Sequence, residues 1–146
     1  MPYTYKYPRP ALTVDCLIFS GNQGAYSVLL IKRGTPPFQG MWALPGGFVD
    51  IEETLVESAS RELKEETGLD NITLHQLYTF DAPDRDPRHR TISVAFYGFV
   101  RKEEVRDIAG DDAADTRWFS LEDLPELAFD HEHVIHTAME KLPGLK

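Results

Sequence analysis

The sequence predicts an α/β domain in which helices pack on the faces of a mixed β-sheet. Short apolar, strand-like segments recur along the chain, and two amphipathic helical segments are interspersed with them, at residues 55–67 and 130–142. The 146 residues, 42% of them hydrophobic and 27% charged, are normal for one globular domain. No repeat, low-complexity tract or linker divides the chain, so residues 1–146 are predicted to form a single domain.

The first third of the chain predicts two strands and a short extended piece. Residues 11–19 alternate apolar and polar side chains, which is the period of a strand with one buried face. The apolar positions are Leu12, Val14, Cys16 and Ile18, and the polar ones are Thr13 and Asp15. Turn-forming residues 21–24 lead to a second, mostly buried strand at 26–33. An irregular loop, 34–40, and an extended piece, 41–48, follow.

A helix is predicted next. Thr54 and Glu57 form a capping-box pair that places the N-cap at Thr54, and Gly68 is suited to end the helix in left-handed backbone. Glu57 is expected to pair with Arg61 one turn later. The predicted core-facing stripe consists of Leu55, Val56, Ala59 and Leu63.

The second half of the chain predicts three more strands and the closing helix. Residues 71–80 and 90–100 have strand character and are separated by the polar loop 81–89. Residues 115–121 form a short strand, and residues 130–142 form the last amphipathic helix.

Composition excludes several classes of protein. The formal net charge of −9 argues against a nucleic-acid backbone or an anionic membrane as the main partner. It does not argue against a small phosphorylated ligand held with a divalent cation. No apolar run approaches the roughly 18 residues that span a membrane, and the N-terminus lacks a signal-peptide stretch. The single cysteine, Cys16, excludes an internal disulfide framework and predicts a cytoplasmic location.

Three acidic side chains lie on one side of the first helix. Glu62, Glu65 and Glu66 are spaced i, i+3 and i+4, beside or at the edge of the core-facing stripe, and are expected to converge on one point. Carboxylates crowded at a half-buried rim repel one another and lose hydration, and a hard cation such as Mg²⁺ relieves both costs. Helix spacing alone leaves a solvated acidic face as the alternative.

The surrounding residues match a known motif. Gly47 is followed by Glu53 after five residues and by the segment RELKEETGL after seven more, which resembles the Nudix box G-x5-E-x7-R-E-U-x-E-E-x-G-U, with U aliphatic. The matching positions are Gly47, Glu53, Arg61, Glu62, Leu63, Glu65, Glu66, Gly68 and Leu69.

This resemblance to the Nudix hydrolase family implies an α/β/α sandwich with a mixed sheet and the Nudix-box helix. It implies hydrolysis of a nucleoside diphosphate linked to another moiety, with Mg²⁺ or Mn²⁺ as cofactor. The implied metal ligands are Glu62, Glu65, Glu66 and the backbone carbonyl of Gly46.

A catalytic set also follows from the resemblance. Arg61 and Glu53 match a pair that holds the helix and its preceding loop in register. Glu66 is a candidate catalytic residue as well as an implied metal ligand. In many Nudix enzymes an acidic residue from the loop before the 115–121 strand acts as a further ligand or general base. Asp112 is the candidate, Asp111 is the alternative beside it, and turn formation is the interpretation without catalysis.

The substrate is suggested by loops that resemble those of Nudix ADP-ribose pyrophosphatases and related NAD-metabolism proteins. One is the RDPR stretch followed by ISVAFY, and the other is RGTPPFQGMWALPGG. The alternatives are a solvated hairpin tip for the arginines and simple packing for the aromatic residues, which is favoured for the tryptophan. The candidate substrate-binding residues are Arg33, Phe38, Trp42, Arg85 and Arg88, with Arg90 a weaker candidate.

The segment before the last helix is less informative. Asp130 is the expected N-cap, and three histidines follow it: His131, His133 and His136. A zinc site is disfavoured because no cysteine or other close ligand accompanies them. The LAFDH run resembles a segment of the ADP-ribose pyrophosphatase subgroup, but no chemical role can be assigned to it.

The expected activity is therefore hydrolysis of ADP-ribose to AMP and ribose 5-phosphate, with this small molecule as the partner. Alternatives within the family are NADH, an oxidised or ordinary nucleoside triphosphate, or a nucleotide sugar. Another is a non-catalytic ADP-ribose-binding regulator attached to a winged-helix domain, for which the chain leaves no room after the Nudix core. Members of the subgroup often dimerise, so a homodimer is an expectation.

Overall fold

A single mixed sheet forms the centre of the molecule. The computed structural model describes residues 2–104 and 115–145. The strands are β1 (Ala11–Asn22), β2 (Ala25–Lys32), β3 (Trp42–Ala43), β4 (Gly46–Phe48), β5 (His75–Phe80), β6 (Thr91–Phe99) and β7 (Thr116–Ser120). The helices are α1 (Leu55–Thr67) and α2 (His131–Lys141), with 3-10 turns at Lys102–Glu104 and Pro143–Leu145. The strand order is β3-β2-β1-β6-β5, with β4 paired to β1 and β7 paired to β2.

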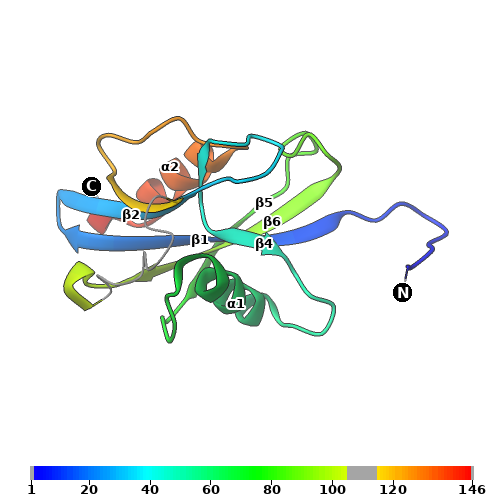
Figure 1. Cartoon of the computed structure of the whole chain (residues 1–146), viewed down its shortest axis with the longest axis horizontal. Helices are drawn as coiled ribbons and strands as arrows, with labels where there is room; N and C mark the ends of the chain where they lie inside the picture. Colours follow the sequence, from blue (N-terminus) through cyan, green and yellow to red (C-terminus); the bar gives the residue numbers. More distant parts are fainter. Residues whose placement is uncertain (1, 105–114, 146) are drawn as a thin grey trace.

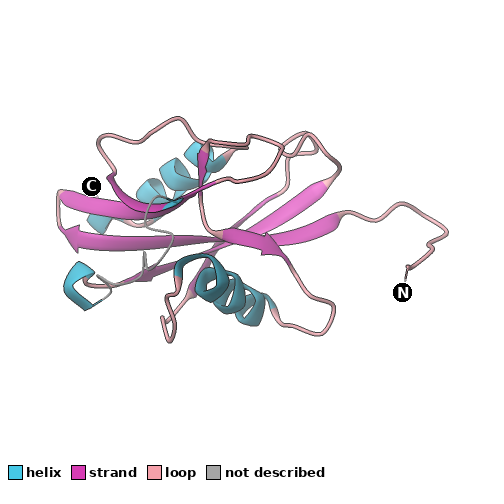
Figure 2. Cartoon of the chain, in the orientation of Figure 1, coloured by secondary structure: helices cyan, strands magenta, loops and turns pink. Residues whose placement is uncertain are grey.

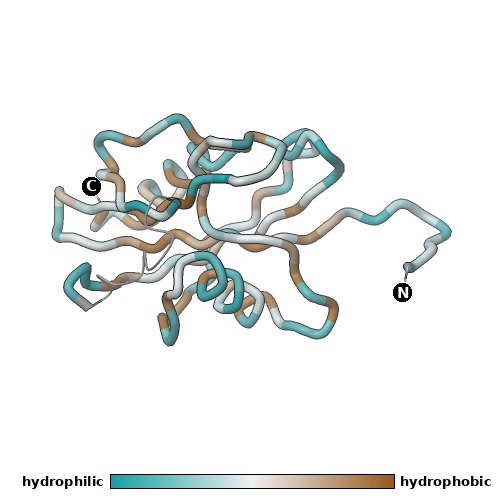
Figure 3. The backbone as a smooth tube through the Cα atoms, in the orientation of Figure 1, coloured by the Kyte–Doolittle hydropathy of each residue, from teal (hydrophilic) through white to brown (hydrophobic). Residues whose placement is uncertain are grey.

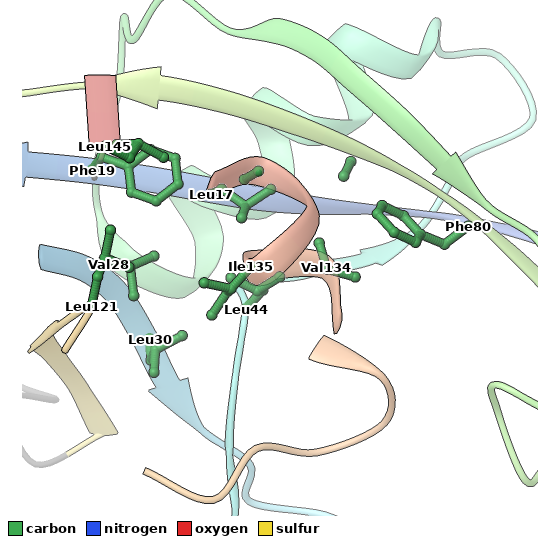
Figure 4. Close-up of a cluster of buried hydrophobic side chains, with 12 residues drawn as sticks. Leu17, Phe19, Val28, Leu30, Leu44, Phe80, Leu121, Val134, Ile135 and Leu145 are labelled. Atoms are coloured by element: carbon green, nitrogen blue, oxygen red, sulfur yellow. The ribbon is translucent and has the colours of Figure 1, made fainter. Parts of the chain in front are cut away.

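The two helices lie on opposite faces of this sheet (Figures 1 and 2). Strand β1 separates two hydrophobic clusters because its successive side chains point to opposite faces. Leu17 and Phe19 of β1 pack in the cluster that contains Val134 and Ile135 of α2, as Figure 4 shows. The second cluster contains β1 residues Val14, Cys16 and Ile18 together with Ala59 and Leu63 of α1. This arrangement confirms the predicted α/β/α sandwich, and the pairing confirms a mixed sheet, since β1 is parallel to β6 and antiparallel to β2 and β4.

One edge of β1 is divided between two partners. Residues 19–22 of β1 pair with β2, whereas residues 13–15 pair with β4. Beyond its pairing with β1, strand β2 pairs with β3 at residues 31 and 32, while residues 27–31 pair with β7. The sheet is therefore split beside the first half of β1, and polar groups of several strands can face the space between.

Helix α1 begins and ends where the sequence predicts. Thr54 accepts from the backbone N–H of Glu57 at 3.2 Å, and Glu57 accepts from the N–H of Thr54 at 2.8 Å, which completes the capping box. Gly68 ends the helix with φ 82°, a value that glycine adopts without strain. The expected pairing of Glu57 with Arg61 was wrong, because the Glu57 carboxylate caps the helix and Arg61 turns to Glu53.

The buried face of α1 differs from the predicted stripe. Val56 is 43% exposed, whereas Ser58 is fully buried and donates to Glu53 Oε1 at 2.7 Å. The face is thus rotated towards Ser58, because the loop that carries Glu53 covers that side of the helix. Figure 3 shows little strongly hydrophobic colour along α1. Because of this rotation, Glu62 and Glu66 lie deeper in the structure than the predicted stripe implies.

Other expectations also fail, since β1 runs to Asn22, into the predicted turn 21–24. Strand β5 begins at His75 instead of residue 71, because Asn71 has left-handed backbone with φ 57°. Asp130 precedes α2 but makes no side-chain cap hydrogen bond, because its carboxylate binds Arg85. Across the part of the chain that the structure describes, neither helix has the length and apolar character needed to cross a membrane.

Candidate active site

A cavity of about 210 Å³ opens at the split in the sheet. It is smaller than the roughly 300–1,000 Å³ of typical ligand pockets, so the described residues enclose only part of a nucleotide-sized ligand. β1 contributes Thr13 and Asp15, and the β4 region contributes Gly46 and Gly47. The charged residues of its lining are Asp15, Arg33, Glu66, Arg85, Asp86 and Arg88. Carboxylates and guanidinium groups therefore share one small space.

Two carboxylates of α1 are fitted closely against β4. Glu66 Oε1 accepts from the backbone N–H of Gly46 at 2.7 Å. A Cβ atom on Gly47 would lie 2.5 Å from the carboxyl carbon of Glu62, so only glycine leaves room for that side chain. Burial raises the pKa of Glu66 to about 8 and also raises the pKa of Glu62. Both groups would therefore gain from a nearby positive charge.

Arg61 supplies the positive charge on the outer side of these carboxylates. Its Nε lies 2.8 Å from Glu53 Oε2, and its Nη2 donates to Glu53 Oε1 at 2.9 Å, so the predicted pair is present. Its Nη1 lies 2.8 Å from Glu62 and 3.3 Å from Glu65. Hydrogen bonds from Arg61 and then Ser58 lower the pKa of Glu53 to about 2. The loop before α1 is thereby tied to the acidic edge of the helix.

The three glutamates among the four predicted metal ligands do not converge in this structure. Within residues 2–104 and 115–145, no three acidic, histidine or cysteine side chains are grouped as a metal site requires. Glu62 and Glu65 instead share Arg61, and Glu66 binds the Gly46 N–H. The donors nevertheless suit a hard divalent cation, because all are carboxylate oxygens and burial disfavours the charge on two of them.

The 81–89 loop forms the basic wall of the cavity. Its Arg85 and Asp86 are 9% and 5% exposed, so the alternative of a solvated hairpin tip was wrong for these residues. Arg88 Nη2 lies 2.8 Å from Asp86 Oδ2, and Arg33 Nε donates to the Pro37 carbonyl at 2.7 Å. Arg90 is exposed and is not part of the lining. Arg33, Arg85 and Arg88 therefore meet at one cavity, and substrate binding by them stays a prediction.

The Arg85–Asp130 ion pair gives a first stability prediction. Arg85 Nε and Nη2 donate to the Asp130 carboxylate at 2.9 and 2.6 Å, and the Arg85 side chain is only 4% exposed. We expect Asp130→Ala to lower the free energy of unfolding by about 3 kcal/mol, because it leaves a buried guanidinium without its main partner. Urea unfolding would measure this.

The matched control is Asp70→Ala, which removes the exposed pair between Asp70 and Lys64 at 3.2 Å. That change should cost less than about 1 kcal/mol. Equal losses for the two variants would show that the Arg85–Asp130 pair behaves as a surface contact.

Two buried residues of the cavity, Asp15 and His131, were not among the predicted site residues. Asp15 is 7% exposed and His131 is 4% exposed, and His131 Nε2 lies 3.5 Å from Asp15 Oδ1. Asp15 also accepts from Ser93 Oγ at 2.5 Å, and His131 Nδ1 accepts from the Leu44 N–H at 3.0 Å. Two features of the sequence could have indicated these residues. Asp15 is a charged residue inside the largely apolar strand 11–19, and His131 ends the LAFDH run. His133 and His136, by contrast, lie exposed on α2.

His131 gives a pH prediction. Burial lowers its pKa, and its Nδ1 is occupied as an acceptor, so the folded chain holds the ring neutral. The unfolded chain binds the proton near the ordinary pKa of about 6.5, so the stabilisation is complete above that pH and declines below it. We expect the loss of unfolding free energy between pH 8 and pH 5.5 to shrink in His131→Asn. An unchanged loss in that variant would contradict the assignment, and His133→Asn serves as the exposed control.

Two of the remaining predicted site residues, Phe38 and Trp42, do not line the cavity. Phe38 contacts the ring of Phe129 at 4.8 Å without forming part of the lining. Trp42 packs against Phe119 at 4.9 Å, beside the α2-side cluster, as the packing alternative proposed. Asp112 falls outside the described residues, as does Asp111. Stacking by either aromatic side chain and catalysis by Asp112 stay predictions.

Comparison with known proteins gives consistent matches. The model of the NUDIX domain matches residues 9–138. The chain is 47% identical over 133 residues to the ADP-ribose pyrophosphatase of Methanocaldococcus jannaschii, covering 91% of this chain and 75% of that protein. It is 38% identical over 141 residues to the ADPR responsive transcriptional repressor NtrR of Acinetobacter baylyi, covering 93% of this chain and 56% of the repressor.

A solved structure shows the same fold. The NUDIX domain of Shewanella oneidensis NrtR, complexed with ADP ribose, matches with a TM-score of 0.79 and 32% sequence identity. The match covers 96% of this chain and 94% of that one. The domain match over most of the chain agrees with three features of the structure: the acidic helix α1, the glycines of β4 and the Glu53–Arg61 pair. This chain belongs to the Nudix family.

Proposed function

We propose that this Nudix pyrophosphohydrolase cleaves the pyrophosphate bond of ADP-ribose with Mg²⁺ or Mn²⁺, giving AMP and ribose 5-phosphate. The observation that carries the proposal is the lining of one cavity by the partly buried Glu66 and by Arg33 and Arg88. Guanidinium groups bind phosphate oxygens through paired, charge-assisted hydrogen bonds. On the same helix as Glu66, Glu62 and Glu65 offer further oxygen ligands for a divalent cation.

The similarity to other proteins supports the choice of ADP-ribose. The archaeal relative is named for hydrolysis of this compound, and the Shewanella oneidensis domain is complexed with it. The chain spans about half of the length of the Acinetobacter baylyi repressor, which is named for its response to ADPR. These proteins differ in their named roles, and the ligand is what they share.

The residues around the cavity have separate proposed roles in the reaction. Glu62, Glu65 and Glu66, with the Gly46 carbonyl, would hold the cation. A cation held there would supply positive charge beside the pyrophosphate and would lower the pKa of a water molecule. Arg61 holds the Glu62 carboxylate at 2.8 Å, and the Gly46 N–H fixes Glu66.

A second candidate function is binding of ADP-ribose without hydrolysis, which the similarity to the repressor favours. The two functions differ in one observable, the release of AMP. A chain that only binds needs no carboxylate set for a cation, whereas here all three glutamates of the Nudix box are present.

A substrate panel tests the proposal. ADP-ribose, NADH, ordinary and oxidised nucleoside triphosphates and a nucleotide sugar would be incubated with the chain, with Mg²⁺ or with EDTA, and products separated by chromatography. We expect the highest kcat/KM for ADP-ribose and loss of AMP release in EDTA. Rapid hydrolysis of a triphosphate with no turnover of ADP-ribose would overturn the substrate assignment, and tight binding without AMP release would favour the regulator.

A further inference from the structure

The segment Phe129–Asp130–His131 lies at the start of α2, and each of its residues lines the cavity or binds a residue that does. Phe129 and His131 line the cavity, and Asp130 binds Arg85, which also lines it. Resting on the proposed function, we propose that Phe129 is a positioning residue that orients Arg33 and Arg88 towards the anionic part of the substrate. Asp130 and His131 already have partners that explain them, whereas Phe129 is a large apolar side chain in a charged cavity.

The two arginines meet on the ring of Phe129. The guanidinium carbon of Arg33 lies 4.9 Å from the ring centroid. That of Arg88 lies 5.6 Å from the same centroid and 5.4 Å from the ring centroid of Phe48. A guanidinium group over an aromatic face within about 6 Å is attracted by the negative face of the ring. Arg33 follows β2 and Arg88 belongs to the loop before β6, so the ring joins side chains from two separate loops.

The backbone at Phe129 is held in an unfavourable conformation. Its φ is 53°, in the left-handed region that bulky side chains rarely adopt, and Phe38 has a φ of 61°. These two residues are far apart in the sequence, yet their rings contact each other edge to face at 4.8 Å. Backbone strain of this kind persists where surrounding contacts compensate for it, and it gathers at binding sites. The strain therefore accompanies a fixed placement of the Phe129 ring at the cavity.

The charges around the ring favour an anion as the occupant. Arg33 and Arg88 carry like charges, and burial together with Arg88 lowers the pKa of Arg33. Arg88 is partly neutralised by Asp86 at 2.8 Å. Within the described residues, Arg33 donates only its Nε–H, to the Pro37 carbonyl, and about four of its five N–H groups remain available. Phosphate oxygens of a nucleoside diphosphate derivative would match these donors.

Three variants test the role of the ring. Phe129→Leu keeps an apolar side chain and removes the aromatic face, and Phe129→Tyr keeps the face. The matched control is Phe119→Leu, since Phe119 also lies under an arginine, with the Arg117 guanidinium carbon 5.9 Å from its centroid, but does not line the cavity. Binding of inorganic pyrophosphate would be measured by calorimetry in buffer free of divalent metal, and kcat and KM for ADP-ribose would be measured with Mg²⁺.

We expect Phe129→Leu to weaken pyrophosphate binding and raise KM by about tenfold, with kcat within about threefold of the original. Phe129→Tyr should restore both values to within about threefold, and Phe119→Leu should leave both unchanged. Equal effects of the two leucine variants, failure of tyrosine to restore binding, or no pyrophosphate binding by the original chain would overturn the proposal. If the original chain releases no AMP from ADP-ribose, the proposed function fails while the calorimetric comparison still decides the role of Phe129.

Discussion

Replacement of Glu66 by glutamine is expected to lower kcat by a factor of about 10² to 10⁴, with the chain still folded. Glutamine keeps the size of the side chain and an oxygen that can accept from the Gly46 N–H, which now lies 2.7 Å from Glu66 Oε1. The loop should therefore keep its place. The amide removes the negative charge, and with it the capacity to hold a divalent cation or to accept a proton. Steady-state kinetics with ADP-ribose and saturating Mg²⁺ would measure the loss.

The control for this variant lies on the same helix. Glu57→Gln makes the same chemical change at an exposed position, and glutamine can still close the capping box with Thr54. Its kcat should stay within about twofold of the original. Glu66→Gln with unchanged kcat would refute the role of this carboxylate, and an equal loss in both variants would point to a general effect on the helix.

The acidic helix could be predicted because everything that defines it is local. Its cap, its end at Gly68 and the spacing of its glutamates depend on residues within a few turns of one another. Its exact buried face could not be predicted, because the choice between Val56 and Ser58 depends on where the loop carrying Glu53 packs.

The other wall of the cavity depends on contacts between distant parts of the chain. Asp15 in β1 and His131 in α2 meet only because the sheet and the last helix come together there. Arg85 was predicted as a ligand-binding side chain, and its bond to Asp130 needs the position of α2, which no local pattern specifies. The same holds for Phe129, whose left-handed backbone has no signature in the LAFDH run. Local patterns thus predict the class of reaction, whereas the residues proposed to shape the substrate site are brought together only by the assembled fold.

The glycines of β4 give the second large effect. Gly47→Ala is expected to reduce activity by about 10²-fold or more with little change in stability. The added Cβ would lie 2.5 Å from the carboxyl carbon of Glu62, and that carboxylate is the end of a flexible side chain that can move away. The chain can thus stay folded while a predicted metal ligand is displaced by about 1 Å, a misplacement that is costly in catalysis.

Gly46→Ala, unlike Gly47→Ala, is expected to lower stability, because its Cβ would collide with the backbone carbonyl oxygen of Val14. Backbone cannot move aside without opening the pairing of β1 with β4, so we expect a loss of about 1–3 kcal/mol in unfolding free energy. Gly34→Ala is the matched control, since its added Cβ would meet nothing within 4 Å. Urea unfolding and kcat would be measured on all three variants. A stable, fully active Gly47→Ala chain would show that Glu62 does not need its present position, and would remove the strongest geometric reason for placing the cation at this edge of α1.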